Sequence, residues 1–155
     1  MTTQEKIKDW SYKFGLEVNN KITKNRPDPI DLDLILEEVD ELKEAYTNGD
    51  VIEQIDAIDD IMWVCHRYAM KLGFDVDKAM EELHKSNMSK LCYSLEEVKE
   101  TKIAYMTGVH PDKPGVVIDV EHKEVYPDQY AIYNTASGKI LKSINFKKPD
   151  YSKFL

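Results

Sequence analysis

The 155-residue sequence has few cysteines, no long hydrophobic run and no excess of basic charge. Its two cysteines, Cys65 and Cys92, lie outside any CxxC pair, and no histidine stands near them at zinc-ligand spacing. This pattern excludes a disulfide-rich scaffold and a cysteine-based zinc site, and it predicts a reducing, cytoplasmic setting. The first residues, MTTQEKIKDW, also lack the apolar run of a secretory signal peptide.

The absence of long apolar runs and of basic excess limits the partners. No stretch approaches the roughly 20 apolar residues that a membrane-spanning helix needs. Acidic residues outnumber basic ones 29 to 21, which gives a net charge of −8. Such a charge argues against non-specific binding to nucleic acid or to an acidic membrane. A small anionic ligand remains compatible, because a bound cation reverses the local field.

What the sequence does contain is helical periodicity over its first 107 residues. Two prolines, Pro27 and Pro29, form part of a break at Arg26–Pro29, and Gly49 and Gly73 stand at expected helix ends. Ser94 and Glu97 have the spacing of a capping box. We predict helices over residues 3–24, 30–46, 51–72, 76–91 and 94–107.

After Gly108 the pattern changes to short alternating segments. These predict strands over residues 116–120, 129–134 and 139–146, with a hairpin loop at 135–138. We therefore expect two domains, a helical one over 1–107 and a small β-rich C-terminal extension over 108–155. A two-stranded hairpin is marginal alone, so the extension should pack on the helical body or on a neighbouring subunit.

Carboxylates gather on the second and third predicted helices. At about 100° per residue, each helix places its acids along one stripe, and the short turn between the helices predicts antiparallel packing. Facing carboxylates would repel unless divalent cations bind, and oxygen ligands alone favour Mg²⁺ or Mn²⁺. The alternative is an ordinary solvated face. The acids are Glu37, Glu38 and Glu41 on the second helix, with Glu53, Asp56 and Asp60 on the third.

These motifs resemble the all-α nucleotide pyrophosphohydrolase superfamily, which includes MazG, phosphoribosyl-ATP pyrophosphohydrolase and dimeric dUTPases. The likeness lies in Glu37-Glu38-x-x-Glu41-Leu42-x-Glu44-Ala45, in the acids of the third helix before Ile61-Met62-Trp63, and in residues 82–90 (ELHKSNMSK). It covers about residues 5–92. One position departs from the pattern, because Ala57 stands three residues before Asp60, where the superfamily usually has Glu. Either Asp56 and Asp60 act together, or Glu53 and Asp56 form the ExxD pair.

The resemblance implies a MazG-like bundle of four or five helices completed by homo-oligomerisation, as a tetramer in preference to a dimer. It implies Mg²⁺-dependent cleavage, with Mn²⁺ as a possible substitute, of the α–β phosphate bond of a nucleoside triphosphate. The products would be a nucleoside monophosphate and pyrophosphate. The implied metal ligands are Glu38, Glu41, Asp56 and Asp60, and Glu37 or Glu53 would hold a further metal or orient water as a base.

Substrate contacts are expected from two further groups. The resemblance implies that Asn87 and Lys90, with Lys85, contact phosphate or sugar, although a polar helix end would also explain them. Trp63 and Phe14 are candidates for stacking on a base, with core packing as the alternative. Arg67 is expected to pair with the acids.

The rival functions are a phosphoribosyl-ATP-specific or dUTP-specific enzyme, and a non-catalytic acidic helical binding protein.

Overall fold

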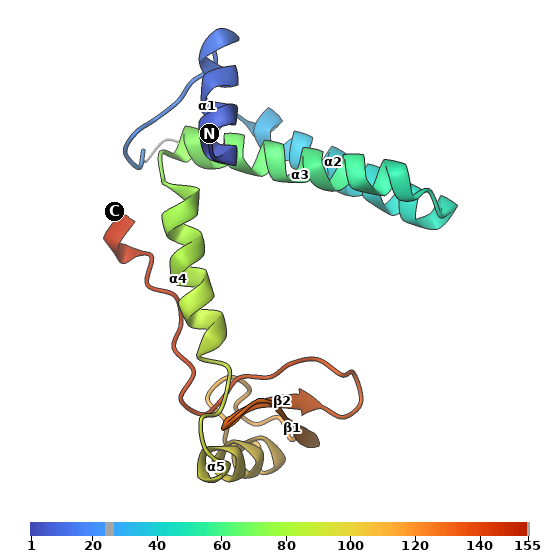
Figure 1. The fold of residues 1–155 in the computed structure, drawn as a ribbon, viewed down its shortest axis with the longest axis vertical. Helices are drawn as coiled ribbons and strands as arrows, with labels where there is room; N and C mark the ends of the chain where they lie inside the picture. The colour runs from blue at the N-terminus through green and yellow to red at the C-terminus, as the bar shows by residue number, and fades with distance from the viewer. Residues whose placement is uncertain (24–26, 155) are drawn as a thin grey trace. The chain divides into compact units, whose positions relative to one another are not determined.

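The computed structural model describes residues 1–23 and 27–154, and within them the chain is mostly helical with one small antiparallel hairpin (Figure 1). It forms two compact units, one of Met1–Met80 with Tyr151–Leu155 and one of Glu81–Asp150. Within the described residues, no helix has the length and apolar character that a membrane span requires. The elements are α1 (Thr3–Lys13), α2 (Pro29–Asn48), α3 (Val51–Leu72), α4 (Val76–Met88), α5 (Leu95–Met106), β1 (Val120–Tyr126), β2 (Gln129–Asn134) and a 3₁₀ turn (Ser152–Phe154).

The long antiparallel pair of α2 and α3 forms the body of the first unit (Figure 1). The turn between them is short because Gly49 adopts a left-handed conformation with φ of 69° and ends α2. The Asp50 carboxylate then accepts the backbone N–H groups of Ile52 and Glu53 and caps α3. The predicted antiparallel pair is confirmed, and α3 has the predicted bounds.

The first helix is shorter than predicted, ending at Lys13 and not near residue 24. Gly15 has φ of 68°, and the chain after it runs beside the end of α3. There the backbone N–H of Asn19 donates to the Met70 carbonyl and that of Thr23 to the Leu72 carbonyl, both at 3.0 Å. These bonds satisfy carbonyls that the end of a helix leaves unpaired, and they explain the early end of α1. Residue 24 and the start of the proline break at Arg26 lie outside the described residues.

The second unit packs α5 against the hairpin. Its buried core consists of Cys92, Val98, Tyr105, Val120, Tyr130, Ile132 and Leu141. The capping of α5 differs from the predicted box in one bond. Ser94 Oγ accepts the N–H of Glu97 as expected, but the Glu97 carboxylate accepts the N–H of Tyr93 and not that of Ser94.

Only one of the three predicted strands is confirmed as predicted, namely Gln129–Asn134. Residues 116–119 are not a strand. Strand β1 begins at Val120 and ends at Tyr126, and the turn that follows it contains Asp128, whose φ is 59°. Segment 139–146 contributes a single bridge between Ile140 and Tyr133. Strand β1 escaped prediction because all its residues after Val120 are exposed, which leaves no alternation to detect.

The division between the units falls within α4, whereas the sequence predicted a domain boundary after residue 107. In the structure, α5 belongs with the hairpin because Val98 and Tyr105 share its core. Whether 1–107 and 108–155 are separate folding domains stays a prediction, since packing does not test independent folding. The α4 helix also ends at Met88 and not at residue 91.

Candidate metal and nucleotide site

Glu38 lies at the centre of the acidic cluster between α2 and α3. Its half-buried carboxyl has a raised pKa, first because burial disfavours the charged form and then because of nearby carboxylates. In order of effect, those carboxylates are Glu41, Asp60, Glu37 and Asp56. The fold therefore brings acids from both helices close enough to repel one another, as the antiparallel pairing predicted.

The third helix contributes Asp56 and Asp60 to this cluster. Both carboxylates act on Glu38, and they are four residues apart, so they share one face of α3. Neither Glu53 nor Asp59 is among the described residues that raise the Glu38 pKa. Ala57, in the position where the superfamily usually has Glu, is buried, with 3% of its surface exposed. A carboxylate at that position would be buried, so it would need a partner or a cation to offset its lost hydration.

The cluster carries only carboxylate oxygens, which suit a hard divalent cation such as Mg²⁺. Across residues 1–23 and 27–154, however, no three carboxylate, imidazole or thiolate groups come close enough to enclose a metal ion. Glu37, Glu41, Asp56 and Asp60 have exposed side chains that the α2–α3 pair does not cover. The chemistry of the donors therefore fits the expected cation, although these described acids are not gathered into a closed group.

Aromatic rings gather where α1 meets α3. The rings of Trp10 and Phe14 are tilted at a centroid distance of 4.7 Å, and Trp63 meets Trp10 edge-on at 5.6 Å. Phe14 is 65% exposed, so it is not a core residue. Trp63 follows Asp60 by three residues on α3, so the ring cluster and the acids share a face of that helix.

A second charged group, which the sequence gave no reason to single out, lies nearby around Asp31. This carboxylate is 3% exposed and accepts a bond from Lys71 Nζ at 2.6 Å, with Arg67 at 3.8 Å. The guanidinium of Arg67 also lies over the Trp10 ring, 5.2 Å from its centroid. The expectation that Arg67 pairs with the acids of the cluster was wrong, because its partner is Asp31 at the start of α2. No local pattern could have revealed this long-range pair.

The remaining predicted substrate residues, Asn87, Lys90 and Lys85, lie in the second unit. Lys85 Nζ donates to Glu82 at 3.0 Å, and this hydrogen bond raises the pKa of Lys85. The Asn87 carbonyl accepts the N–H of Lys90, and the Lys90 carbonyl accepts that of Ser143. The three residues thus mark the end of α4 and the start of the next segment.

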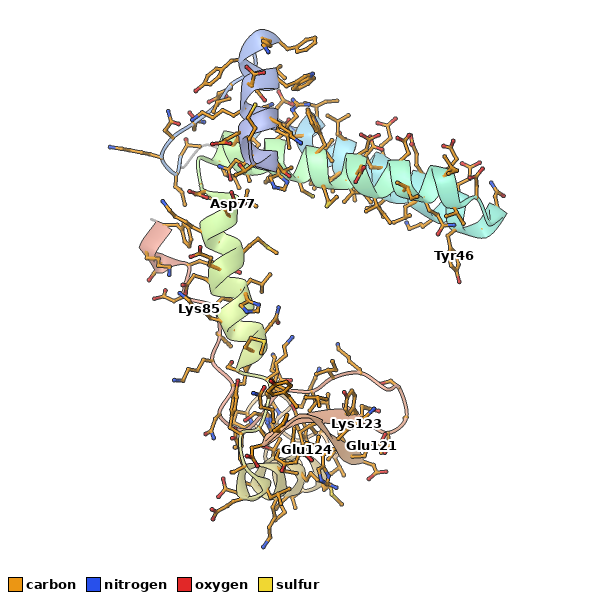
Figure 2. All side chains as sticks on the ribbon, in the orientation of Figure 1. Tyr46, Asp77, Lys85, Glu121, Lys123 and Glu124 are labelled. Atoms are coloured by element: carbon orange, nitrogen blue, oxygen red, sulfur yellow. The ribbon has the colours of Figure 1, made fainter. Side chains whose placement is uncertain are left out.

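Side chains project from both helices of the α2–α3 pair (Figure 2). Tyr46 projects from the far end of the pair and is 76% exposed. On the helix faces, a row of large apolar side chains is about half exposed, namely Leu32, Leu36, Ile55, Ile58 and Met62. An apolar row of this size on a helix pair is typical of a surface that another helix covers.

The comparison with protein families agrees with the motifs of the α2–α3 pair. Residues 16–87 match the family described as phosphoribosyl-ATP pyrophosphohydrolase. That family is part of the MazG-like, all-α nucleoside triphosphate pyrophosphohydrolase superfamily, so the resemblance seen in the sequence is confirmed over this segment. Within that superfamily the matching family consists of pyrophosphohydrolases, which are hydrolases acting on acid anhydrides.

Part of this chain is also similar in sequence to a viral protein. An uncharacterized protein of Acanthamoeba polyphaga mimivirus is 43% identical to this chain over 84 residues. The shared stretch is 54% of this chain and 32% of that protein. The chain thus matches about a third of the length of this relative, whose name states no activity.

Proposed function

We propose that the chain is a Mg²⁺-dependent nucleoside triphosphate pyrophosphohydrolase that cleaves the α–β phosphate bond and yields a nucleoside monophosphate and pyrophosphate. The observation that carries this proposal is the carboxylate cluster around Glu38, within a segment of pyrophosphohydrolase sequence. MazG-like pyrophosphohydrolases generally depend on divalent metals. A cation bound here would neutralise the triphosphate and the carboxylates together.

The proposed cation ligands are Glu38, Glu41, Asp56 and Asp60. Their support is the mutual repulsion at Glu38, because a site that assembles like charges stores electrostatic energy that a cation releases. Glu37 also acts on Glu38, so we prefer Glu37 to Glu53 as the general base that takes a proton from the attacking water. Glu53 has less support, since the described charges that act on Glu38 do not include it.

For the substrate, we propose that the base stacks on Trp63 and Phe14. The phosphate or sugar contacts of Asn87, Lys90 and Lys85 are a separate expectation, which the family resemblance alone supports. The exposed Phe14 ring and the half-buried Trp63 ring offer flat apolar surface in the unit that carries the acids. The two lysines carry the charge that phosphate needs.

We also propose that the active form is a homo-oligomer, a tetramer in preference to a dimer. The half-exposed apolar row on α2 and α3 supports this, because burying it removes apolar surface from water. A second copy would also add donor groups to a carboxylate cluster that one chain leaves open. The proposal thus links assembly to completion of the metal site.

The test of this function is a panel of the eight common nucleoside triphosphates, with phosphoribosyl-ATP added, incubated with Mg²⁺ or Mn²⁺. Pyrophosphate and the nucleoside monophosphate should appear in equal amounts, and chelation of the metal should stop both. Orthophosphate with a nucleoside diphosphate would place the cut at the β–γ bond and contradict the proposal. Absence of any product, together with absence of metal binding, would favour the non-catalytic binding protein.

A further inference from the structure

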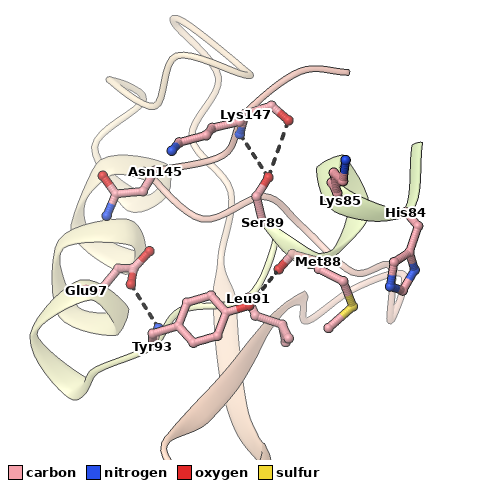
Figure 3. A pocket seen from close by; sticks show the side chains of 9 residues that line it. All are labelled: His84, Lys85, Met88, Ser89, Leu91, Tyr93, Glu97, Asn145 and Lys147. Atoms are coloured by element: carbon pink, nitrogen blue, oxygen red, sulfur yellow. Dashed lines mark hydrogen bonds between the residues drawn. The ribbon is translucent and has the colours of Figure 1, made fainter. Parts of the chain in front are cut away.

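A cavity of about 520 Å³ lies in the unit Glu81–Asp150, at the end of α4 (Figure 3). Small-molecule sites occupy about 300–1,000 Å³, so the cavity has room for a ligand of nucleotide size. It is larger than a bare phosphate needs. Most residues that line it, including Met88, Tyr93 and Lys147, follow the segment matched to the pyrophosphohydrolase family. The cavity is therefore a feature that the family match does not account for.

Hydrogen bonds hold the walls of the cavity together. The Ser86 hydroxyl donates to the Lys147 carbonyl at 2.8 Å, and the Lys147 N–H donates to Ser89 Oγ at 2.9 Å, while the Ser89 hydroxyl donates to the Ser86 carbonyl at 2.7 Å. The segment around residue 147 is thus fastened to the end of α4 by its backbone. The side chain of Lys147 takes no part in these bonds, so it is available to a ligand.

The charge lining the cavity favours an anion. Glu97 is the lining carboxylate, but its oxygens already accept the Ser143 hydroxyl and the Tyr93 N–H. The Lys147 ammonium forms no ion pair with any described residue, whereas the Lys85 ammonium is already paired with Glu82 at 3.0 Å. An incoming phosphate or carboxylate would meet the Lys147 ammonium, next to a carboxylate whose oxygens are already hydrogen-bonded.

The walls favour a flat apolar group. Met88, Leu91 and the ring of Tyr93 line the cavity, and the Tyr93 hydroxyl donates to the Met88 carbonyl at 3.3 Å, which fixes the ring (Figure 3). A methionine side chain adapts its shape and packs well on aromatic rings. The amide of Asn145 also lines the cavity and offers both a donor and an acceptor.

From these features we infer that the cavity binds an aromatic organic anion of nucleotide size. Its ring would pack between Tyr93 and Met88, and its phosphate or carboxylate would contact Lys147. This site uses no metal and none of the acids of α2 and α3, although Lys85 lines it and is also one of the proposed substrate contacts.

The experiment titrates the full chain in EDTA with adenosine monophosphate, adenosine and inorganic phosphate, and follows methionine methyl signals by NMR. The Met88 signal is assigned with a Met88→Leu variant. Adenosine monophosphate should shift it saturably, and adenosine or phosphate alone should bind about tenfold more weakly, because each lacks one half of the recognition. A missing shift at millimolar nucleotide, or phosphate binding as tightly as the nucleotide, would overturn the inference.

A matched pair of variants locates the anion contact. Lys147→Met removes the ammonium but keeps the backbone bonds to Ser86 and Ser89, and it should weaken nucleotide binding about tenfold. Lys148→Met changes the neighbouring exposed lysine, which does not line the cavity, and should leave binding within about twofold. Equal effects of the two variants would overturn the inference.

Failure of this site and failure of the proposed hydrolysis remain distinguishable. The Glu41→Gln variant should keep the nucleotide-induced shift of the Met88 signal, because Glu41 lies in the other unit. A protein that hydrolyses triphosphates but shows no shift refutes only the cavity.

Discussion

At the scale of single residues, repulsion among carboxylates defines the candidate metal site. The Glu38 carboxyl has a raised pKa because it is partly desolvated and because four other acids lie near it. A folded state that raises a carboxyl pKa loses stability as pH rises through 4.5, the ordinary pKa, towards the raised value. The cluster therefore costs stability at neutral pH unless a cation binds.

The first prediction concerns Glu38→Gln. Without divalent metal, this variant should have a higher Tm than the wild type at neutral pH, because it removes one of the mutually repelling charges. The gain should vanish below pH 4.5, where Glu38 is protonated in both states. Mg²⁺ at ten times its Kd should stabilise the wild type by about 1.4 kcal/mol and the variant by less. If Mg²⁺ raised the Tm of the wild type and of the variant equally, Glu38 would not be a metal ligand. The control is Asp40→Asn, which changes an exposed neighbour that is paired with Lys43.

A second prediction concerns His110. Its ring is buried and stacks on the ring of Tyr105, with 3.8 Å between the ring centroids. Its Nδ1 accepts the N–H of Asp112, so the neutral ring carries its proton on the buried Nε2. Burial lowers the pKa of His110 below 6.5. The charge of Asp112 and the backbone of Lys142 and Ser143 act to raise the pKa, but burial outweighs them. Because the unfolded chain then binds the proton first, stability should fall as pH drops below 6.5, by at most about 1.4 kcal/mol per pH unit.

The measurement for His110 is Tm across the range between about pH 7.5 and pH 5.5. His110→Asn keeps an acceptor for the Asp112 N–H but does not titrate, so its Tm should be lower overall and should fall less with acid. His122→Asn, at an exposed position on β1, should keep the wild-type slope. An unchanged slope in His110→Asn would show that other groups control the acid response.

At the scale of helices and strands, the sequence predicted best where local signals mark both ends. Helix α3 was predicted with its observed bounds because Asp50 caps its start and Gly73 its end. Helix α1 was predicted too long, because its end depends on bonds to carbonyls about 50 residues away, which no local pattern encodes. The acids of α2 and α3 were found from their spacing, and Asp56 and Asp60 were already the preferred ligands on the third helix. That preference stays a prediction, although both of these acids, and not Glu53, act on Glu38.

Two helix-ending glycines give the third prediction. Gly73 has φ of 89°, and a Cβ there would lie 2.0 Å from the Lys21 carbonyl oxygen. Gly49 has φ of 69° but meets nothing within 4 Å. Left-handed backbone costs an alanine about 1–2 kcal/mol, so Gly49→Ala should lose about that amount, and Gly73→Ala clearly more because of the clash. Urea unfolding measures both; equal losses would mean that the segment beside α3 does not pack as described.

At the scale of the whole molecule, the exposed apolar row on α2 and α3 predicts association. Wild-type protein should run in light scattering at a multiple of the 18.0 kDa chain mass. Ile58→Asp places a charge in the row and should shift the mass towards one chain, because burying an unpaired carboxylate is costly. Val117→Asp, at an exposed site in the other unit, should leave the mass unchanged. A wild-type protein that stays a single chain at all concentrations would contradict the prediction.

The central claim is that acids of the α2–α3 pair hold the metal for pyrophosphate release. The most direct test compares Glu41→Gln with Asp40→Asn on the best substrate of the nucleotide panel in Mg²⁺. Glu41→Gln should lower turnover at least about a hundredfold while its helical circular dichroism stays unchanged, because loss of a metal ligand removes charge stabilisation worth several kcal/mol. Asp40→Asn should keep wild-type turnover. Wild-type pyrophosphate release by Glu41→Gln would contradict the account.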